Sequence, residues 1–257
     1  MEFSFYKYQG TGNDFVIIDN RQNTFPKNNT KLVGQMCDRK FGIGADGLIL
    51  LENHPSAHFT MVYYNADGNP SSMCGNGGRC LVHFAKHLGI IDDVATFEAI
   101  DGMHEASINE NVVALKMNDV TAVDMHNTHT FLDTGSPHHV EMTADIGKID
   151  VKKLGRTIRN DVYGMEGANV NFVERISEDT FSVRTYERGV EDETLSCGTG
   201  VTAVAIAMFE MKHTESNIVT LETPGGDLKV HFSKNGSRYT DVILEGPAML
   251  VFKGVWK

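Results

Sequence analysis

The residues of this chain best suited to chemistry are two copies of the pattern Cys-Gly-x-Gly, Cys74-Gly75-Asn76-Gly77 and Cys197-Gly198-Thr199-Gly200. Each copy opens a segment whose apolar spacing predicts a helix, so each cysteine would stand at a helix N-terminus. Backbone N–H groups at a helix N-terminus lack intrahelical partners and carry roughly half a positive charge. They would lower the pKa of a thiol placed there, and they would bind a carboxylate.

Two such helix ends facing each other could invert the configuration of an amino acid. One thiolate would remove the α-proton, and the other cysteine would deliver a proton to the opposite face of the α-carbon. The N–H groups would hold the α-carboxylate and stabilise the charge that develops on it. The remaining cysteines, Cys37 and Cys80, fall on predicted helices away from their starts, so we predict packing roles for them.

The elements that must position the two patterns are themselves repeated. Strand-like runs at 58–64 and 180–186 each end in Tyr and a polar turn with Gly, and each leads to Cys-Gly-x-Gly and a helix. The first helix shows an amphipathic stripe, whereas the second, 201–211, is apolar nearly all round and should be buried. A further echo sets 13–16 beside 169–173. We predict two similar halves, richer in strands than in helices, that meet near 117–120.

Composition narrows the class of function. The formal net charge of −11 argues against nucleic-acid and membrane partners but says little about a small-molecule substrate. The N-terminus lacks the apolar core of a signal peptide, and the longest apolar run, 201–209, is too short to span a bilayer. We therefore expect a soluble, cytoplasmic protein. Four cysteines without a C-x-x-C pair indicate neither a disulfide framework nor a structural zinc site.

Other motifs give little support to cofactor chemistry. Gly42–Gly47 matches G-x-G-x-x-G, but a helix-like segment precedes it and a strand-like one follows, the reverse of a dinucleotide site. No Walker A sequence occurs, and no lysine stands out for pyridoxal phosphate. The spacing of His126, His129, His138 and His139 matches no zinc motif, and we expect solvated loop histidines, His138 excepted. No cofactor and no metal are expected.

The whole set of motifs resembles the diaminopimelate epimerase family, over essentially the entire chain. The motifs that carry the resemblance are Gly12–Phe15, Gly42–Gly47, Asn65–Gly68, Met73–Cys80, Pro137-His138, Tyr186–Gly189 and Cys197–Gly200. The resemblance implies an α+β fold of two pseudo-symmetric domains. Each would be a barrel-like, mostly antiparallel sheet around a central helix, with the active site in the cleft between the domains. The domains would comprise residues 1–118 with 247–257, and residues 119–246.

The resemblance also implies an activity and its residues. Members convert LL-2,6-diaminopimelate to the meso form, without pyridoxal phosphate or metal, in lysine and peptidoglycan biosynthesis, and many are homodimers. Cys74 and Cys197 would be the acid/base pair, with His138 and Glu187 helping to set their proton balance. The α-carboxylate would be held by amides, and the unreactive end by side chains; the two sets are Gly75, Asn76, Gly198 and Thr199, and Asn13, Asn65, Asn169, Glu187 and Arg188.

Two departures from the family pattern bear on the substrate. Ser136 stands where many members have asparagine, and the loop 189–194 is one residue longer than usual and lacks its internal glycine. The runner-up is therefore a racemase of the proline or hydroxyproline type. Outside enzymes, the alternatives are an amino-acid-binding protein and a thiol redox sensor in which Cys74 and Cys197 form a reversible disulfide. A sensor should tolerate the loss of Asn13, Asn65 and Arg188, whereas an epimerase should not.

Overall fold

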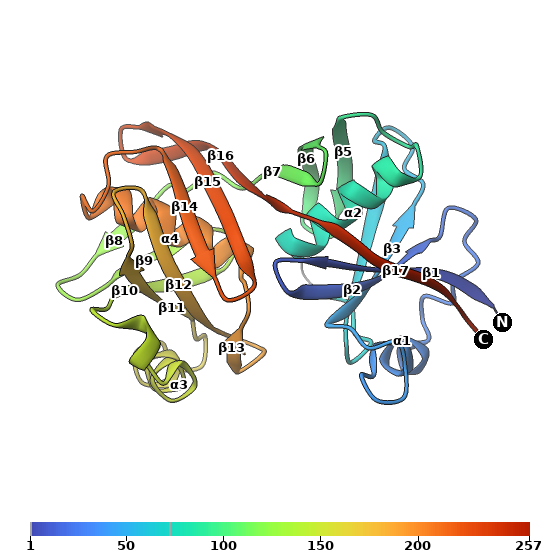
Figure 1. The fold of residues 1–257 in the computed structure, drawn as a ribbon, viewed down its shortest axis with the longest axis horizontal. Helices are drawn as coiled ribbons and strands as arrows, with labels where there is room; N and C mark the ends of the chain where they lie inside the picture. The colour runs from blue at the N-terminus through green and yellow to red at the C-terminus, as the bar shows by residue number, and fades with distance from the viewer. Residues whose placement is uncertain (1, 72) are drawn as a thin grey trace. The chain divides into compact units, whose positions relative to one another are not determined.

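The computed structural model describes residues 2–71 and 73–257, which form two compact units (Figure 1). Unit 1 comprises Met1–Leu115 and Gly246–Lys257, and unit 2 comprises Lys116–Glu245. Each unit is a mixed sheet with few helices, so the chain has the α+β, two-part architecture expected from its sequence. Among the described residues the sheet is not closed, so the halves are barrel-like without forming closed barrels.

Unit 1 is built on a ladder of strands with two helices. Its chain begins with a hairpin whose turn, Thr11-Gly12, has positive φ at both residues, 50° and 83°. The C-terminal strand β17 pairs antiparallel with β1, so both ends of the chain lie in this unit. The elements are β1 (Phe3–Gly10), β2 (Asn13–Asp19), α1 (Thr30–Cys37), β3 (Gly47–Glu52), β4 (Phe59–Asn65), α2 (Gly75–His87), β5 (Val94–Ala99), β6 (Gly102–Asn109), β7 (Val112–Lys116) and β17 (Met249–Trp256).

Unit 2 contains two α-helices, one of them capped by a side chain that accepts from the backbone. Asp150 accepts a hydrogen bond from the N–H of Lys153 and so begins α3. The elements are β8 (Val123–Met125), β9 (Thr130–Asp133), β10 (Pro137–Met142), the 3₁₀ turn η1 (Ile146–Lys148), α3 (Val151–Asp161), β11 (Asn169–Arg175), β12 (Thr180–Glu187), β13 (Asp192–Thr194), α4 (Gly198–Glu210), β14 (Ile218–Thr223), β15 (Gly226–Asn235) and β16 (Arg238–Pro247).

The two units repeat one series of strand pairings. In unit 1, β2 pairs parallel with β3, β3 antiparallel with β4, β4 parallel with β5, and β5 antiparallel with β6. In unit 2, β10, β11, β12, β14 and β15 pair in the same sequence of directions. Helix α2 follows β4 as α4 follows β12. The strand–turn–helix repeat seen in the sequence therefore reflects a repeat of topology.

The repeat corrects one detail of the sequence analysis. The echo between 13–16 and 169–173 suggested equivalent strands, but Asn13 begins β2 and Asn169 begins β11. By its pairings β2 corresponds to β10, because each is antiparallel to the strand before it and parallel to the next strand of the ladder. A short sequence of Asn followed by apolar residues suits the start of any half-buried strand, so it does not show which strands of the two units are equivalent.

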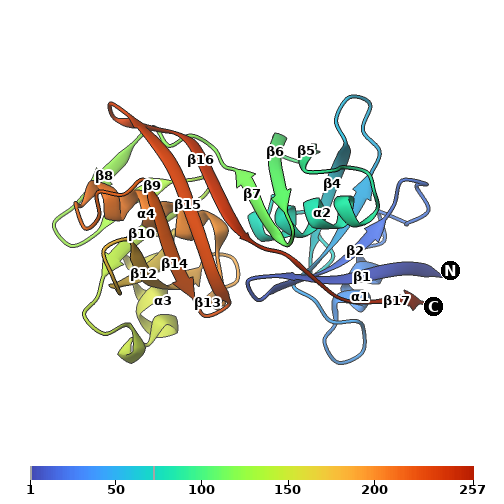
Figure 2. The ribbon, with the colours of Figure 1, turned by 45° about the horizontal axis from the view of Figure 1, so that its top comes forward.

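The helices α2 and α4 lie at the centre of their units, running across the strands in both views (Figures 1 and 2). Helix α4 is buried almost throughout, from Gly200 to Met208, and belongs to the main core of unit 2. This confirms the prediction of a buried helix. Helix α2 buries its first turns and the apolar stripe Leu81, Phe84 and Ala85. The longest helices of the described residues, α2 and α4, have 13 residues each, and none is long and apolar enough to cross a membrane.

Candidate active site

Both cysteines of the repeated pattern are N-cap residues of 13-residue helices. Cys74 caps α2 with φ −107° and ψ 119°, and Cys197 caps α4 with φ −129° and ψ 113°. The carbonyl of each accepts the first helical hydrogen bond, from Gly78 at 2.8 Å and from Val201 at 3.0 Å. Neither side chain caps its helix, so the first N–H groups of α2 and α4 are presented by Gly75–Gly77 and Gly198–Gly200.

The Cys74 thiol lies against the side-chain amide of Asn13. Its Sγ is 3.4 Å from Asn13 Oδ1, which also accepts from Asn76 Nδ2 at 3.3 Å. The Asn13 amide is oriented from its other side, because its Nδ2 donates to Asp46 at 2.7 Å. Three of the predicted residues are therefore brought together in unit 1. Asn65 lies at the end of β4 with its side chain exposed.

Asp46 is a residue of this site that the sequence analysis did not single out. Its carboxylate holds Asn13 and is itself bonded to Arg39 at 2.6 Å. The signal was present in Gly42–Gly47, a motif that was rejected as a nucleotide site. The structure has α1 before the motif and β3 after it, the order that the sequence predicted.

In unit 2, Cys197 belongs to a chain of polar contacts that reaches the interior. Its Sγ is 3.5 Å from Thr199 Oγ1, and that hydroxyl lies 3.0 Å from His138 Nε2. On the other side of the ring, Asn171 Nδ2 lies 3.1 Å from His138 Nδ1. The same amide donates to the carbonyl of His139 and accepts from Thr185, which fixes its orientation. His138 Nδ1 is therefore the acceptor.

This assignment determines the tautomer of His138. With Nδ1 accepting, the proton of the neutral ring is on Nε2, which donates to Thr199 Oγ1, so that the Thr199 hydroxyl can donate to the Cys197 sulfur. Asn169 Nδ2 also lies 3.4 Å from Nε2, a long contact between two donors that we do not count as a bond. His138 is fully buried, and burial, followed by the charge of Arg188, lowers its pKa to about 3. It is a neutral donor at physiological pH.

The neutral state of His138 gives a prediction for stability against pH. Its folded pKa of about 3 is below the ordinary value of 6.5, so the unfolded chain binds more protons between these values. Stability from this group is complete above about pH 6.5 and is lost as the pH falls towards 3. We expect wild type to lose about 2 kcal/mol more than His138→Gln between pH 7 and pH 5, measured by urea unfolding. Equal losses in the two proteins would contradict this.

The other two cysteines are poor candidates for proton transfer. Burial raises the pKa of Cys37 to about 12 and that of Cys80 to about 12. Both side chains lie in the core, which agrees with the predicted packing roles.

The remaining predicted residues of unit 2 surround the end of β12. Glu187 is its last residue and is half-buried, and Arg188 follows it with an exposed side chain. The Arg188 backbone N–H donates to Asn169 Oδ1 at 2.8 Å, and its Nη1 donates to the Glu166 carbonyl at 2.8 Å. Asn169 thus links the His138 group to the turn that carries Arg188.

The longer loop before Cys197 is well anchored. Glu191 has a positive φ of 58°, and its N–H donates to the Glu187 carbonyl at 2.8 Å. Its carboxylate accepts from the Tyr186 hydroxyl at 2.9 Å, from the N–H of Gly189 at 3.1 Å and from Arg159 Nε at 3.2 Å. Glu191 therefore closes a tight turn of this loop against α3.

The other histidines differ in part from expectation. His139 is buried, with Nδ1 2.9 Å from the Tyr163 hydroxyl, and its ring stacks on that of His129 at 4.3 Å. The prediction of a solvated loop histidine was wrong for His139 because it lies on β10, next to His138 but on the other side of the strand. Within residues 2–71 and 73–257, no group of His, Cys, Asp or Glu is arranged to hold a metal ion.

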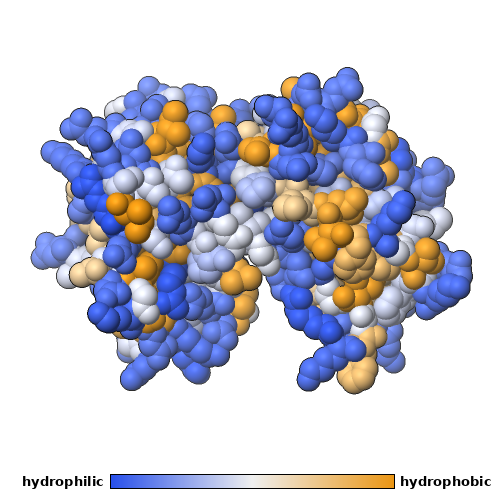
Figure 3. All heavy atoms as spheres, in the orientation of Figure 1, coloured by the Kyte–Doolittle hydropathy of each residue, from blue (hydrophilic) through white to orange (hydrophobic). Residues whose placement is uncertain are grey.

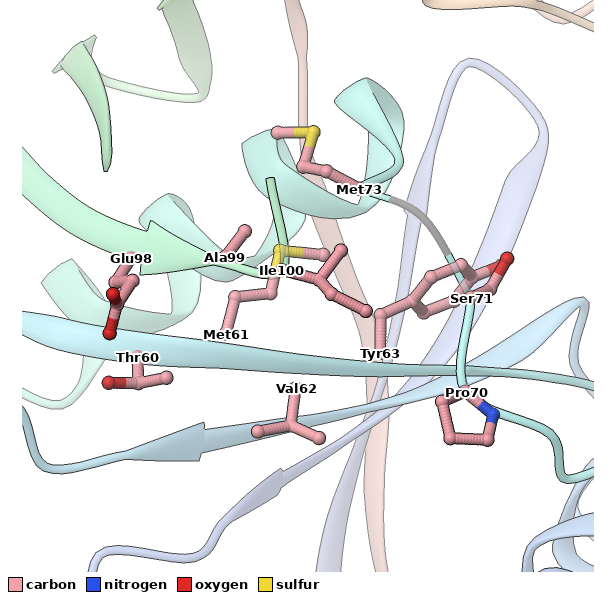
Figure 4. Close-up of a pocket in the computed structure, with 10 residues that line it drawn as sticks. All are labelled: Thr60, Met61, Val62, Tyr63, Pro70, Ser71, Met73, Glu98, Ala99 and Ile100. Atoms are coloured by element: carbon pink, nitrogen blue, oxygen red, sulfur yellow. The ribbon is translucent and has the colours of Figure 1, made fainter. Parts of the chain in front are cut away.

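A pocket of about 240 Å³ opens in unit 1, where β5 diverges from β4 (Figure 4). It is lined by apolar side chains such as Met61 of β4 and Ile100, which directly follows β5, together with Met73, which directly precedes Cys74. None of the predicted site residues lines it.

Comparison with known proteins identifies the family. The family model described as diaminopimelate epimerase matches residues 5–123 and 130–251. A diaminopimelate epimerase of Flavobacterium psychrophilum is 58% identical over 250 residues, covering 96% of this chain and 98% of the relative. One from Chlorobaculum tepidum is 44% identical, covering 95% and 98%.

Solved structures show the same fold at low identity. A phenazine biosynthesis protein of the PhzF family from Bacillus anthracis has a TM-score of 0.76 at 12% identity, covering 100% of this chain and 99% of the other. A hydroxyproline epimerase from Agrobacterium vitis has a TM-score of 0.70 at 13% identity, covering 99% and 92%. The family model and the two relatives each match nearly the whole length of the chain. The chain therefore belongs to the diaminopimelate epimerase family of amino-acid isomerases.

Proposed function

We propose that the protein epimerises LL-2,6-diaminopimelate to the meso form by proton transfer between Cys74 and Cys197. The observation that carries the proposal is the matched placement of the two thiols, each the N-cap of a 13-residue helix whose first N–H groups come from small or polar residues. A helix end of this kind stabilises both a thiolate and a bound carboxylate. One cysteine at a helix N-terminus would not point to this function by itself. Two such cysteines in a repeated topology suit a reaction at two opposite faces of one α-carbon.

In the proposed step, one thiolate takes the α-hydrogen as a proton, and the electron pair of the broken C–H bond delocalises into the α-carboxylate. The other thiol gives its proton to the opposite face, which forms the new C–H bond and leaves that sulfur as the thiolate. Protons and charge balance without a cofactor. The amides of Gly75, Asn76, Gly198 and Thr199 would hold the carboxylate and stabilise its added charge.

At Cys197, the Thr199 hydroxyl would supply a hydrogen bond to the thiolate, and neutral His138 would orient that hydroxyl. At Cys74 the thiol faces the Asn13 oxygen, so Asn13 would accept from the protonated sulfur. The two thiols thus have different partners, and Glu187 would add a negative charge that influences their proton balance.

Recognition of the unreactive end of the substrate is proposed for Asn13, Asn65, Asn169, Glu187 and Arg188. The exposed Arg188 guanidinium could pair with the distal carboxylate, and Glu187 with the distal ammonium. Ser136, where many members have asparagine, would leave a shorter side chain at this end. The product would serve lysine and peptidoglycan biosynthesis in the cytoplasm.

The substrate is tested by incubating the reduced protein with LL-diaminopimelate and, separately, with L-proline, trans-4-hydroxy-L-proline, L-glutamate and L-lysine. The proposal predicts conversion of diaminopimelate to an LL/meso mixture, with rates for the others at least about 100-fold lower. Rapid turnover of proline or hydroxyproline instead would retain the chemistry and overturn the substrate. A protein that binds diaminopimelate without converting it would be a binding protein, and one that only forms a disulfide would be a redox sensor.

The proposed partner is a second copy of the chain, because β17 has the properties of a pairing edge. Its one ladder among the described residues is with β1, and it exposes Met249, Val251, Phe252 and Val255. Hydrophobic side chains gather on the face over β17 and β1 (Figure 3). An exposed apolar edge strand invites pairing with another strand.

We expect Val251→Lys to shift the protein from dimer to monomer in sedimentation at micromolar concentration. A lysine on the exposed edge would have to be buried without a partner in a dimer that uses it. Met165→Lys is the matched control, since Met165 is exposed in unit 2, and it should leave the dimer intact. A monomeric wild-type protein, or a dimer that tolerates Val251→Lys, would contradict the proposed edge.

A further inference from the structure

Arg79 is a fully buried arginine in the second turn of α2, the helix that Cys74 caps. Its relative exposure is 0%, and it is the largest of the fully buried side chains. The sequence analysis noted Arg79 only as part of the Met73–Cys80 motif and gave it no role. An arginine is almost never fully buried unless a partner compensates its charge, because removing an ion from water is costly.

Protein partners of the guanidinium are few. Nη2 donates to the hydroxyl of Thr11 at 3.2 Å, and no group of the described residues accepts from Nε or Nη1. A Cβ on Gly10 would lie 3.4 Å from Nη2, so the guanidinium packs directly on the β1 backbone there. Arg79 is joined to no carboxylate in residues 2–71 and 73–257.

The acidic groups on neighbouring elements are engaged elsewhere or exposed. Helix α2 packs on β1, β2, β3, β6 and β17. The ionisable groups of these elements that have a partner of their own are Tyr8 with His83, Asp14 with Lys7 and Arg39, Asp19 with Arg21, Glu52 with Lys27, and His104 with Asp101. Those that are exposed are Glu105, His87 and Lys253.

Two thiols share the surroundings of this charge: Cys80 Sγ and Arg79 Nη2 pack on the same face of Gly10, where a Cβ would lie 3.3 and 3.4 Å from them, and Cys74 caps the helix that carries Arg79. Burial lowers the pKa of Arg79, and the groups whose negative charge would offset this are Cys80 and Cys74. Cys80 is fully buried, and burial raises its pKa to about 12, so it stays a neutral thiol. Cys74 is the one of the two that is only half-buried and stands at the helix N-terminus.

We propose that Arg79 is the buried counter-charge of Cys74, a positioning residue that favours the thiolate at this helix end. No carboxylate of the described residues is bonded to the buried cation, and the low polarity around it strengthens its attraction for a thiolate on the same helix. The charge would act in addition to the helix N-terminus and would also favour a carboxylate bound at the same end.

The same residue also ties the site to the β1–β2 turn. Thr11, which accepts from Arg79, has a positive φ of 50° and is buried, although its side chain is β-branched. Two residues later in the same turn, Asn13 places its Oδ1 on the Cys74 sulfur. Arg79 therefore holds the backbone that carries the neighbour of the thiol.

Unit 2 offers the internal comparison. Arg79 lies five residues after Cys74, and the residue five after Cys197 is Thr202. Thr202 is also fully buried, but its hydroxyl donates to the Gly198 carbonyl of its own helix and carries no charge. The two proton-transfer centres therefore differ, because only the helix capped by Cys74 carries a buried positive charge.

The proposal is tested by the pH dependence of alkylation of the reduced protein with iodoacetamide, with Cys74 and Cys197 followed separately by peptide mass mapping. In Arg79→Met, the Cys74 midpoint should rise by about one to three units, while that of Cys197 stays unchanged. Arg79→Lys, which keeps the charge, should restore most of the shift.

Thr202→Val is the matched control at the same helix position and should leave the Cys74 midpoint in place. Thermal unfolding shows whether Arg79→Met folds; if it does not, Arg79→Gln and Arg79→Lys decide. An unshifted Cys74 midpoint in a folded Arg79→Met or Arg79→Gln would overturn the proposal. It rests on the proposed function only for the use of the thiolate. Because alkylation needs no substrate, its failure is distinguishable from a lack of epimerisation.

Discussion

Replacing Cys74 with alanine is expected to lower the rate of epimerisation by roughly 10²- to 10⁴-fold, the contribution typical of a positioned acid or base. Cys197→Ala should cost a similar factor, because every turnover in either direction uses both thiols. The measurement is the initial rate of meso formation from LL-diaminopimelate, with the fold of each variant checked by circular dichroism.

Cys37→Ala is the matched control for these variants. Cys37 is buried on α1 and its pKa is raised to about 12 by burial, so it should take no part in proton transfer. Its replacement removes one thiol from the same unit as Cys74 and should leave the rate within about threefold of wild type, apart from any loss of stability. Substantial activity in either Cys74→Ala or Cys197→Ala would contradict the two-thiol account.

Arg188→Met is expected to reduce kcat/KM for diaminopimelate by roughly 10- to 150-fold, mostly through KM. The guanidinium is exposed, and its carbonyl contact to Glu166 uses only one of its donors, so the others can pair with the distal carboxylate. Loss of a hydrogen bond to a charged group costs about 1.5–3 kcal/mol.

The Arg188→Met variant also separates substrate recognition from chemistry. The α-hydrogen exchange of an amino acid that lacks the distal carboxylate, such as L-lysine, should not depend on residue 188, however slow it is. Arg175→Met, which changes an arginine bonded to the Ser177 carbonyl in the same unit, should leave both reactions unchanged. An unaltered KM for diaminopimelate in Arg188→Met would remove Arg188 from the recognition of the distal end.

The sequence was most informative where local chemistry and periodicity agreed. Cys-Gly-x-Gly followed by an apolar periodic segment predicted two helices that begin directly after Cys74 and Cys197, and both do. A helix start is a local event that depends on a few residues, which is why it can be read from sequence. The burial of α4 followed in the same way from its all-apolar composition.

What the sequence did not predict depends on tertiary contacts. The alignment of Asn13 with Asn169 failed because strand order and pairing direction decide which strands correspond. His139 was expected in solvent. His138 and His139 are neighbours on one strand, so their side chains face opposite sides of the sheet, and Tyr163 covers the side of His139. Arg79 and Asp46 have ordinary surface residue types. Their roles are visible only through what surrounds them.

The most direct test of the account is the reaction of wild-type protein with LL-diaminopimelate in D₂O, followed by NMR over the first few per cent of conversion. Each thiol exchanges its proton with solvent between turnovers, so the incoming group is S–D. Proton transfer between Cys74 and Cys197 predicts that the meso product carries deuterium at the inverted carbon, while the recovered LL substrate keeps its hydrogen. Product that retains the substrate's own hydrogen would indicate a single base that returns the same proton, and would contradict proton transfer between Cys74 and Cys197.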